Sequence, residues 1–337
     1  GPIEPAKVGV TSTHEHLLID FSVVFTEPTE ASQRLLMDEE VSLQNLGWVR
    51  YNWTSNRDNL RILDEEISTR EAKQFFNAGG GTIVDVTSVG LARDPHALAR
   101  IARATGLNIV MGAGNYVHLT HPPEIASLTV EQIAGQIIHD VDEGVGDTGI
   151  RSGIIGEIGC SWPWHESEQK TLEAAVIAQR ETGAPLLIHP GRNERAPIEL
   201  IEAVEKWGGN ISRVVMGHIE RTVYDRGILN ELIATGVYLN FDLFGHESSF
   251  YPLAPESHMP ADHERIQMVE YMIAEGQKGR ILLAHDICSK HRLKNYGGHG
   301  FDHIISRVVP RMRARGMSRE TERLILVDNP TRMLTFD

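Results

Sequence analysis

Short apolar runs rich in β-branched residues alternate along the chain with longer stretches in which apolar residues recur at the helical period. A short apolar run bounded by turn residues is typical of a strand that is buried on both faces. We predict strands at residues 7–13, 82–86, 108–112, 152–155, 185–188, 213–216, 237–241 and 280–284.

The stretches of helical period between these runs predict helices. They lie at residues 64–77, 94–104, 130–143, 166–181, 195–206, 225–234 and 263–275. One of them begins with Asp94 followed by Pro95, which are an N-cap residue and a proline in the first turn. This helix and two others end where helices are expected to end, before Gly106, Gly183 and Gly236, each of which stands just ahead of the next strand.

Eight strands that are each followed by a helix are the number that closes a (β/α)8 TIM barrel, which typically takes about 250 residues before insertions. The surplus length falls mainly into two segments, residues 20–59 after the first strand and residues 245–261 after the seventh. A doubly wound sheet is the alternative, but no GxGxxG turn follows the first strand. We therefore predict an α/β protein in which residues 1–337 form one TIM-barrel domain.

Composition and charge narrow the possible partners. The chain has 337 residues, of which 41% are hydrophobic and 23% charged, and its net charge at pH 7 is −14. This acidity argues against nucleic acid or an anionic membrane surface as a partner, and no apolar run approaches the ~18 residues of a membrane helix. The two cysteines, Cys160 and Cys288, are too few for a disulfide scaffold and favour a reducing, cytoplasmic compartment.

Side chains of metal-ligating type stand just beyond the carboxyl ends of the predicted strands. They are His14 and His16 at the first strand, Glu157 at the fourth, His189 at the fifth, His218 at the sixth, and Asp286 beside His285 at the eighth. The loops that follow the strands of a TIM barrel converge on one rim, where active sites lie. These residues are therefore expected to meet at that rim, although they are far apart in the sequence.

The residue types suit divalent metal ions. His14 and His16 are two positions apart, so on an extended chain both point to the same face and can bind one ion. Imidazole nitrogens and carboxylate oxygens bind Zn²⁺ and related ions, and Glu157 has two oxygens with which to bridge a pair. Taken singly, each residue is more often structural, and the whole set predicts the metal centre. His285 is not assigned to the metal centre, because a histidine at this position either packs in the core or supports a ligand.

With these residues the chain resembles the phosphotriesterase family of the amidohydrolase superfamily, in particular its phosphotriesterase-related proteins, over nearly its whole length. The matching motifs are Thr13-His14-Glu15-His16, GEIGCSWP at residues 156–163, Gly217-His218, Ala284-His285-Asp286, YGGHGF at residues 296–301 and the tail at residues 328–336. The first motif alone has low specificity, whereas the ordered set is specific.

The resemblance implies two divalent ions per chain. His14, His16 and Asp286 would hold the buried ion, His189 and His218 the exposed one, and Glu157 would bridge them. It further implies hydrolysis by a metal-bridging hydroxide, with Asp286 as the catalytic proton acceptor, and a homodimer. Zn²⁺ is the first candidate, while Mn²⁺ and Co²⁺ suit the same ligands.

Two departures from the family pattern bear on the activity. Founding phosphotriesterases carry a carboxylated lysine where this chain has Glu157. Related lactonases carry an arginine after the aspartate of the seventh-strand loop, where this chain reads Asp242-Leu243. The GxSxG motif of serine hydrolases is absent. We expect a metal-dependent hydrolase that cleaves an amide or carboxylic ester bond of a small molecule. Lactone or phosphoester hydrolysis is the alternative within this class, and a metal-containing binding protein is the alternative outside it.

Four residues are candidate substrate contacts. Tyr116 stands where the lactonases have a third-strand tyrosine, and Trp162 is one of several aromatic residues that either line the pocket or pack the long loops. Lys290 and Arg292 belong to a run of three cations within residues 290–294. That run is either a solvated surface or the part of the rim that holds an anionic group of the substrate, such as an N-acyl amino acid, with Arg292 as the first contact.

Overall fold

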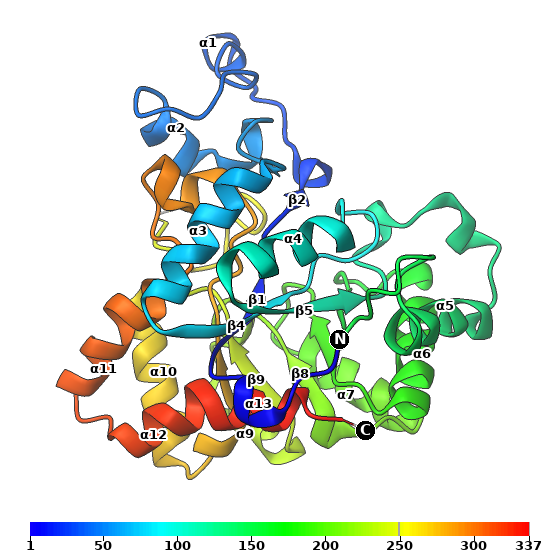
Figure 1. Ribbon diagram of the computed structural model, residues 1–337. Coiled ribbons are helices and arrows are strands. Elements are labelled where there is room, and N and C mark those ends of the chain that lie inside the picture. The colour runs from blue at the N-terminus through cyan, green and yellow to red at the C-terminus, as the bar shows by residue number, and fades with distance from the viewer. Residues whose placement is uncertain (249, 337) are drawn as a thin grey trace.

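The computed structural model, which describes residues 1–248 and 250–336, contains a ring of eight parallel strands surrounded by helices (Figure 1). The strands are β1 (Val10–Glu15), β4 (Gly80–Asp85), β5 (Asn108–Ala113), β6 (Ile154–Gly159), β7 (Leu186–His189), β8 (Val214–Met216), β9 (Tyr238–Phe241) and β10 (Ile281–Leu283). Their order in the sheet follows their order in the chain. The first and last strands meet, because Thr13 Oγ1 donates to Leu283 O (3.0 Å) and Asp286 N donates to His14 O (3.1 Å). The predicted TIM barrel is confirmed, and the doubly wound alternative is excluded.

Seven helices follow the first seven strands within one residue of the predicted bounds. They are α3 (Glu65–Asn77), α4 (Pro95–Thr105), α5 (Val130–Asp142), α6 (Glu166–Thr182), α7 (Ala196–Lys206), α9 (Arg226–Thr235) and α10 (Asp262–Ala274). Local chemistry fixes their ends, since the Asp94 side chain accepts from Ala97 N at the start of α4, and Gly106, Gly183 and Gly236 end three helices with φ values of 82°, 72° and 81°.

The remaining strands and α-helices lie outside this regular alternation and were not predicted by their ranges. They are the short antiparallel pair β2 (Ile19–Asp20) and β3 (Arg61–Ile62), and the helices α1 (Ala31–Arg34), α2 (Leu46–Tyr51), α8 (Ile219–Thr222), α11 (Val309–Ala314), α12 (Arg319–Arg323) and α13 (Asn329–Leu334). In Figure 1, α1 projects from the rest of the molecule, and α2 lies closer to it; both belong to the segment between β1 and α3. Among the described helices, none is both long enough and apolar enough to cross a membrane.

The C-terminal helix closes one end of the ring. Val84, Ile154, Leu187 and Leu282, on four strands, form one buried cluster with Met333 of α13. Asn329, at the start of α13, donates from Nδ2 to the backbone oxygen of the first residue of β10 (2.9 Å). This places α13 at the amino ends of the strands. The opposite end, where the strands finish, is therefore the end left for an active site.

The strands approach one another closely at Gly112 of β5. A Cβ atom added at Gly112 would lie 2.0 Å from the backbone oxygen of Gly156 in β6 and 3.2 Å from Val86 Cα. Because backbone atoms cannot move aside as a flexible side chain can, Gly112→Ala is expected to lower the free energy of unfolding by about 1–3 kcal/mol or more. Thermal and denaturant unfolding measure this loss.

Gly135→Ala is the matched control for this substitution. Gly135 lies inside α5, and an added Cβ would meet nothing within 4 Å. That variant is expected to gain up to about 1 kcal/mol, because alanine reduces the conformational freedom of the unfolded chain. Equal effects of the two substitutions would show that the close approach at Gly112 does not limit stability.

Candidate active site

The structure brings the six predicted metal ligands together at the carboxyl end of the barrel. They come from five strands and their ends: His14 in β1 with His16 just after it, Glu157 in β6, His189 at the end of β7, His218 after β8, and Asp286 after β10. Three strand predictions stopped before their ligand, because β1 runs to residue 15, β6 to residue 159 and β7 to residue 189. Polar residues replace the apolar run there, yet their backbones still pair with a neighbouring strand. His14, Glu157 and His189 therefore lie within strands rather than beyond them.

Two of these six residues have an unusual backbone conformation. Within the described chain, a φ in the left-handed region occurs at three non-glycine residues, and His218 (53°) and Asp286 (49°) are two of them. Such a conformation costs about 1–3 kcal/mol and persists where the surroundings hold it. Here Asp242 accepts a hydrogen bond from His218 N (2.9 Å), and His14 O accepts one from Asp286 N (3.1 Å). The left-handed conformation thus occurs where side chains must be aimed at one point.

The first group of ligand-type atoms consists of His14, His16 and Asp286. Asp286 Oδ1 lies 3.2 Å from His16 Nε2 and 3.7 Å from His14 Nε2. One oxygen of Glu157, Oε1, completes the group at 3.5 Å from His14 Nε2 and 3.4 Å from His16 Nε2. Two imidazoles and two carboxylates therefore face one small space.

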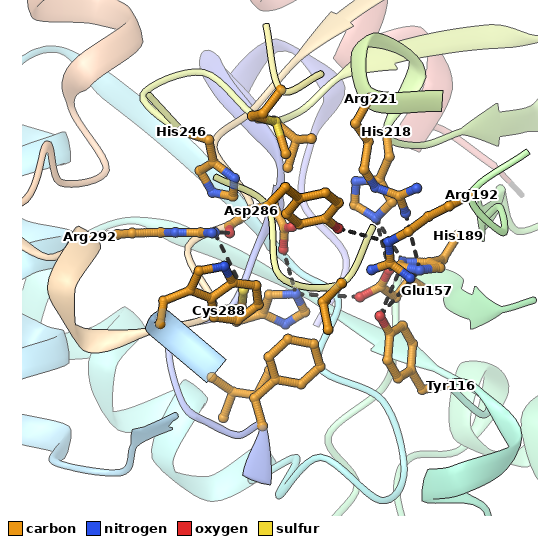
Figure 2. A pocket seen from close by; sticks show the side chains of 18 of the residues that line it. Tyr116, Glu157, His189, Arg192, His218, Arg221, His246, Asp286, Cys288 and Arg292 are labelled. Carbon is orange, nitrogen blue, oxygen red and sulfur yellow. Dashed lines mark hydrogen bonds and ion pairs between the residues drawn. The ribbon is translucent and has the colours of Figure 1, made fainter. Parts of the chain in front are cut away.

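The second group consists of Glu157, His189 and His218. The other oxygen of Glu157, Oε2, lies 2.9 Å from His189 Nδ1 and 3.5 Å from His218 Nε2. These two ring nitrogens are 2.8 Å apart. Glu157 thus presents one oxygen to each group, which is the arrangement expected of a bridging carboxylate (Figure 2).

Two side chains orient the imidazoles from behind. His16 Nδ1 is 2.9 Å from Thr87 Oγ1, and His218 Nδ1 is 2.8 Å from Asp242 Oδ1. A proton on each Nδ1 would leave the Nε2 lone pair directed at the shared space, as metal-binding histidines require. The second oxygen of Asp242 lies 3.0 Å from His14 Nδ1, so this aspartate reaches one histidine of each group. The sequence analysis gave Asp242 no such role, although it stands directly after β9.

The charges of this network fit bound cations. Burial alone would lower the pKa of His14, but Glu157 and Asp242 raise it well above its usual value. Burial would also lower the pKa of His16, but Asp286 and Glu157 raise that pKa to about 9. Within the described residues, the buried Nε2 of His14 forms no hydrogen bond, and its nearest carboxylate oxygen, Glu157 Oε1, lies 3.5 Å away. The site therefore combines an unused nitrogen donor with carboxylates that stabilise positive charge, and imidazole and carboxylate ligands are those that Zn²⁺ and related ions take.

A cavity opens over the two groups, and both long segments contribute to its wall. Phe21 and Trp53 come from the segment after β1, whereas His246, Tyr251 and Met259 come from the segment after β9. A larger adjoining cavity of about 470 Å³ shares four of these residues, Trp53, His246, Tyr251 and Met259. Three arginines, Arg192, Arg221 and Arg292, also line the wall (Figure 2).

The four predicted substrate contacts separate into two pairs. Tyr116 and Arg292 line the cavity, and Tyr116 Oη lies 3.2 Å from His189 Nδ1. Trp162 and Lys290 do not belong to its described wall. Trp162 is 38% exposed, and Lys290 forms an ion pair with Asp58 (2.5 Å). A nearby acidic side chain thus already compensates the lysine charge.

The His285–Glu15 pair and the two cysteines near the site have structural roles. His285 Nδ1 is bonded to Glu15 Oε1 (2.5 Å), and the other Glu15 oxygen accepts from Ile287 N (3.1 Å), so Glu15 braces both sides of Asp286. Cys160 and Cys288 are buried free thiols, and burial raises the pKa of each well above its usual value. Neither thiol is therefore a reactive thiolate at neutral pH.

Comparison with known proteins decides the family. A family model described as "Phosphotriesterase family" matches residues 1–334. This chain belongs to the phosphotriesterase family. The resemblance stated from its motifs is confirmed, and the chain is a metal-dependent hydrolase.

Relatives within this family span nearly the whole chain. A phosphotriesterase-related protein of Nematostella vectensis is 44% identical over 339 residues, which cover 100% of this chain and 97% of that protein. The N-acetyltaurine hydrolase of Mus musculus is 43% identical over 337 residues, with 100% and 96% covered. A crystal structure of a resiniferatoxin-binding protein from Rhodobacter sphaeroides has a TM-score of 0.96 at 33% identity, covering 99% of this chain and 93% of that chain.

Sequence reasoning missed two arginines of this phosphotriesterase-family site. Arg192 stands three residues after His189, and Arg221 stands three residues after His218. Both positions follow a strand end by a few residues, which is the signal that identified the histidines. Arginine is not a metal-ligand residue type and neither position lies in the cationic run at residues 290–294, so the two signals that identified the other charged site residues do not include them.

Proposed function

We propose that this member of the phosphotriesterase family hydrolyses the amide bond of a small N-acyl compound that carries an anionic group away from that bond. One observation carries the proposal: Glu157 presents an oxygen to each of two ligand groups, directly beneath a cavity lined by three arginines. The carboxylate shared by two ligand groups suits metal-dependent hydrolysis, and the arginines suit an anionic substrate. N-acetyltaurine hydrolase, the name of several relatives that cover the whole chain, denotes a substrate of this class.

We assign two divalent ions to the site, with Zn²⁺ as the first candidate. His14, His16 and Asp286 would hold one, His189 and His218 the other, and Glu157 both. Ions bound there would acidify a water to a pKa of about 7 and polarise the carbonyl group of the substrate. Because Glu157 is a carboxylate as synthesised, the bridge forms without the carbon dioxide that a carboxylated lysine needs.

Asp286 is the residue we assign to proton transfer. One of its oxygens faces His16 and His14, while no described residue bonds the other, and the side chain retains 15% exposure toward the cavity. Burial would raise the pKa of Asp286, but His16 and the neighbouring histidines lower it below its usual value. The group is therefore a carboxylate at neutral pH, ready to accept a proton during attack and to return it to the leaving amine.

Metal content tests the two-ion assignment. We expect elemental analysis to find two divalent ions per chain, and chelation to remove both the ions and the activity. His14→Ala removes a ligand of one group, so it should lower occupancy and abolish turnover. His139→Ala, which alters an exposed histidine on α5, is the control and should change neither. One tightly bound ion per chain at full activity would contradict the assignment.

A substrate panel tests the bond that is cleaved. We expect the metal-loaded enzyme to cleave N-acetyltaurine and N-acetyl-β-alanine with kcat/KM at least about tenfold above its values for a lactone and an aryl phosphotriester, which is a difference of about 1.4 kcal/mol. Colorimetric detection of the free amine measures the first two reactions. Preference for the lactone or the phosphotriester would assign the chain to the alternative activities.

We also propose a domain organisation, an assembly state and a cellular location for the protein. We expect one barrel domain, a homodimer as the family suggests, and a cytoplasmic location, which two buried free cysteines support. Light scattering of the purified protein tests the dimer.

A further inference from the structure

Two arginines beside the candidate metal centre have no acidic partner among the residues that the structure describes. Arg192 and Arg221 both line the cavity, and Arg221 is only 4% exposed. Across residues 1–248 and 250–336, neither guanidinium has a carboxylate oxygen within 4.0 Å. Buried charges in proteins are usually paired, because an unpaired one loses its hydration without compensation. A buried unpaired arginine beside a partly buried one in the same cavity therefore calls for an explanation.

Among the described residues, the contacts that hold Arg192 in place are to an uncharged side chain. Its Nε donates to Tyr251 Oη (2.9 Å), and its guanidinium lies 5.4 Å from the centre of the Tyr251 ring. Both contacts are to a neutral phenol. No described residue accepts a hydrogen bond from either Nη, so these donors are available to a ligand in the cavity.

Arg221 is likewise held by neutral groups. Its Nη1 donates to Thr222 Oγ1 (3.1 Å), and its Nη2 donates to Pro190 O (3.2 Å). The same Nη2 lies 3.2 Å from His189 Nε2. If His189 binds an ion through Nδ1, its Nε2 carries the proton and cannot accept from Arg221. Metal binding would thus leave another arginine donor free.

The carboxylates of the site do not remove the need for an anion. Glu157, Asp242 and Asp286 all face histidines, and the two divalent ions assigned above would more than neutralise these three charges. Arg192 and Arg221 line the same cavity and lie on the same side of Asp286 (Figure 2). The two like charges therefore disfavour each other unless an anion lies between them.

We propose that Arg192 and Arg221 together bind the anionic end group of the substrate, a carboxylate or a sulfonate, and so select for charged N-acyl compounds. This inference rests on the proposed amide hydrolysis. It replaces Arg292 as the first expected anion contact. Arg292 Nη1 donates to the backbone oxygen of Asp286 (3.0 Å), and its guanidinium lies over Trp53 at 5.3 Å. Figure 2 shows Arg292 on the other side of Asp286 from Arg192 and Arg221, so Arg292 is placed to position the Asp286 loop.

Kinetics on three amides of equal chain length test the pair. N-acetyltaurine ends in a sulfonate, N-acetyl-β-alanine in a carboxylate, and N-propylacetamide in a neutral methyl group. Arg192→Gln and Arg221→Gln are each expected to raise KM for the anionic amide that the wild type prefers by about 10- to 150-fold, as loss of a charge-assisted hydrogen bond does. The kcat/KM for N-propylacetamide should fall much less, because that amide carries no charge for the arginines to bind. The preferred anion identifies the end group.

Two controls separate charge from structure. Arg195→Gln alters an exposed arginine of the same loop that pairs with Glu231 (2.6 Å), and it should leave all three amides unaffected. Arg192→Lys keeps the charge and should retain part of the anion preference. Equal losses on charged and neutral amides, or loss of the preference in Arg292→Gln but not in Arg192→Gln, would overturn the inference.

Binding of ethanesulfonate and propionate gives a second readout that requires no turnover. Either anion should raise the Tm of the metal-loaded wild-type enzyme, and Arg192→Gln and Arg221→Gln should lose that increase. If no amide is cleaved but the anion still binds through both arginines, the proposed amide hydrolysis fails and the arginine site stands. If amides are cleaved without regard to charge and neither anion binds, the arginine site fails and the hydrolase stands.

Discussion

Replacing Asp286 with asparagine is expected to lower kcat/KM by about 10²- to 10⁴-fold, the usual contribution of a positioned proton acceptor. The amide keeps the size of the side chain and one oxygen toward His16 and His14, which now lie 3.2 and 3.7 Å from Oδ1. It cannot accept the proton that the carboxylate accepts. Because the pKa of Asp286 lies below its usual value, the wild-type group is fully ionised at neutral pH and the whole effect should appear there.

Metal content must be measured beside the rate, because Asp286 is also a proposed ligand. A rate that falls while two ions remain bound identifies lost proton transfer, whereas loss of both identifies lost coordination. Asp38→Asn is a control at an exposed aspartate that pairs with Arg57 (3.2 Å) in the segment between β1 and α3. Wild-type turnover by the Asp286→Asn enzyme at full occupancy would assign the proton to another group.

Local signals explain why the bounds of the helices after the first seven strands could be predicted. The caps at Asp94 and the glycines that end α4, α6 and α9 act within a few residues, so the sequence alone places these helix ends. The segment after β10 was different. Its helical stretch from residue 304 to 314 begins with a wider π turn and contains Pro310, and a proline inside a helical pattern ordinarily predicts that the helix ends or kinks there.

The site could be predicted where one rule applied to every strand. Residues at successive strand ends meet in a barrel whatever lies between them, so His14, Glu157 and Asp286 could be grouped without any knowledge of distances. Asp242 follows the same rule, yet its value depends on contacts with His14 and His218 that only the folded chain reveals.

The directions of the predicted substrate-contact side chains were harder to infer, because loops rather than strands position them. Lys290 and Arg292 are two residues apart, yet Lys290 turns to Asp58 and Arg292 to the cavity. Nothing in their spacing distinguishes the two directions. The acidic partner of Lys290 comes from the long segment after β1, whose path has no periodic pattern from which to infer it.

Glu157→Gln is expected to cause the broadest failure of the site, since it affects both ligand groups at once. Glu157 Oε1 faces His14 and His16, while Oε2 faces His189 and His218. Glutamine replaces one of these oxygens with an NH₂ group, which directs protons at a cation and removes the negative charge shared by two dications. We expect fewer than two ions per chain and a fall in kcat/KM beyond the roughly 10- to 100-fold that loss of a supporting residue causes.

Reconstitution separates this bridge from that of the lysine-bearing relatives. A lysine must first react with carbon dioxide, so its metal uptake responds to bicarbonate, whereas Glu157 already carries both oxygens. Metal uptake by the wild-type chain should therefore be the same with and without bicarbonate, and Glu181→Gln, on the exposed face of α6, should behave as wild type. Two bound ions and normal rates in Glu157→Gln would mean that another residue joins the groups. Among the described residues, Asp242 would be the first to examine, because its two oxygens already reach His14 and His218.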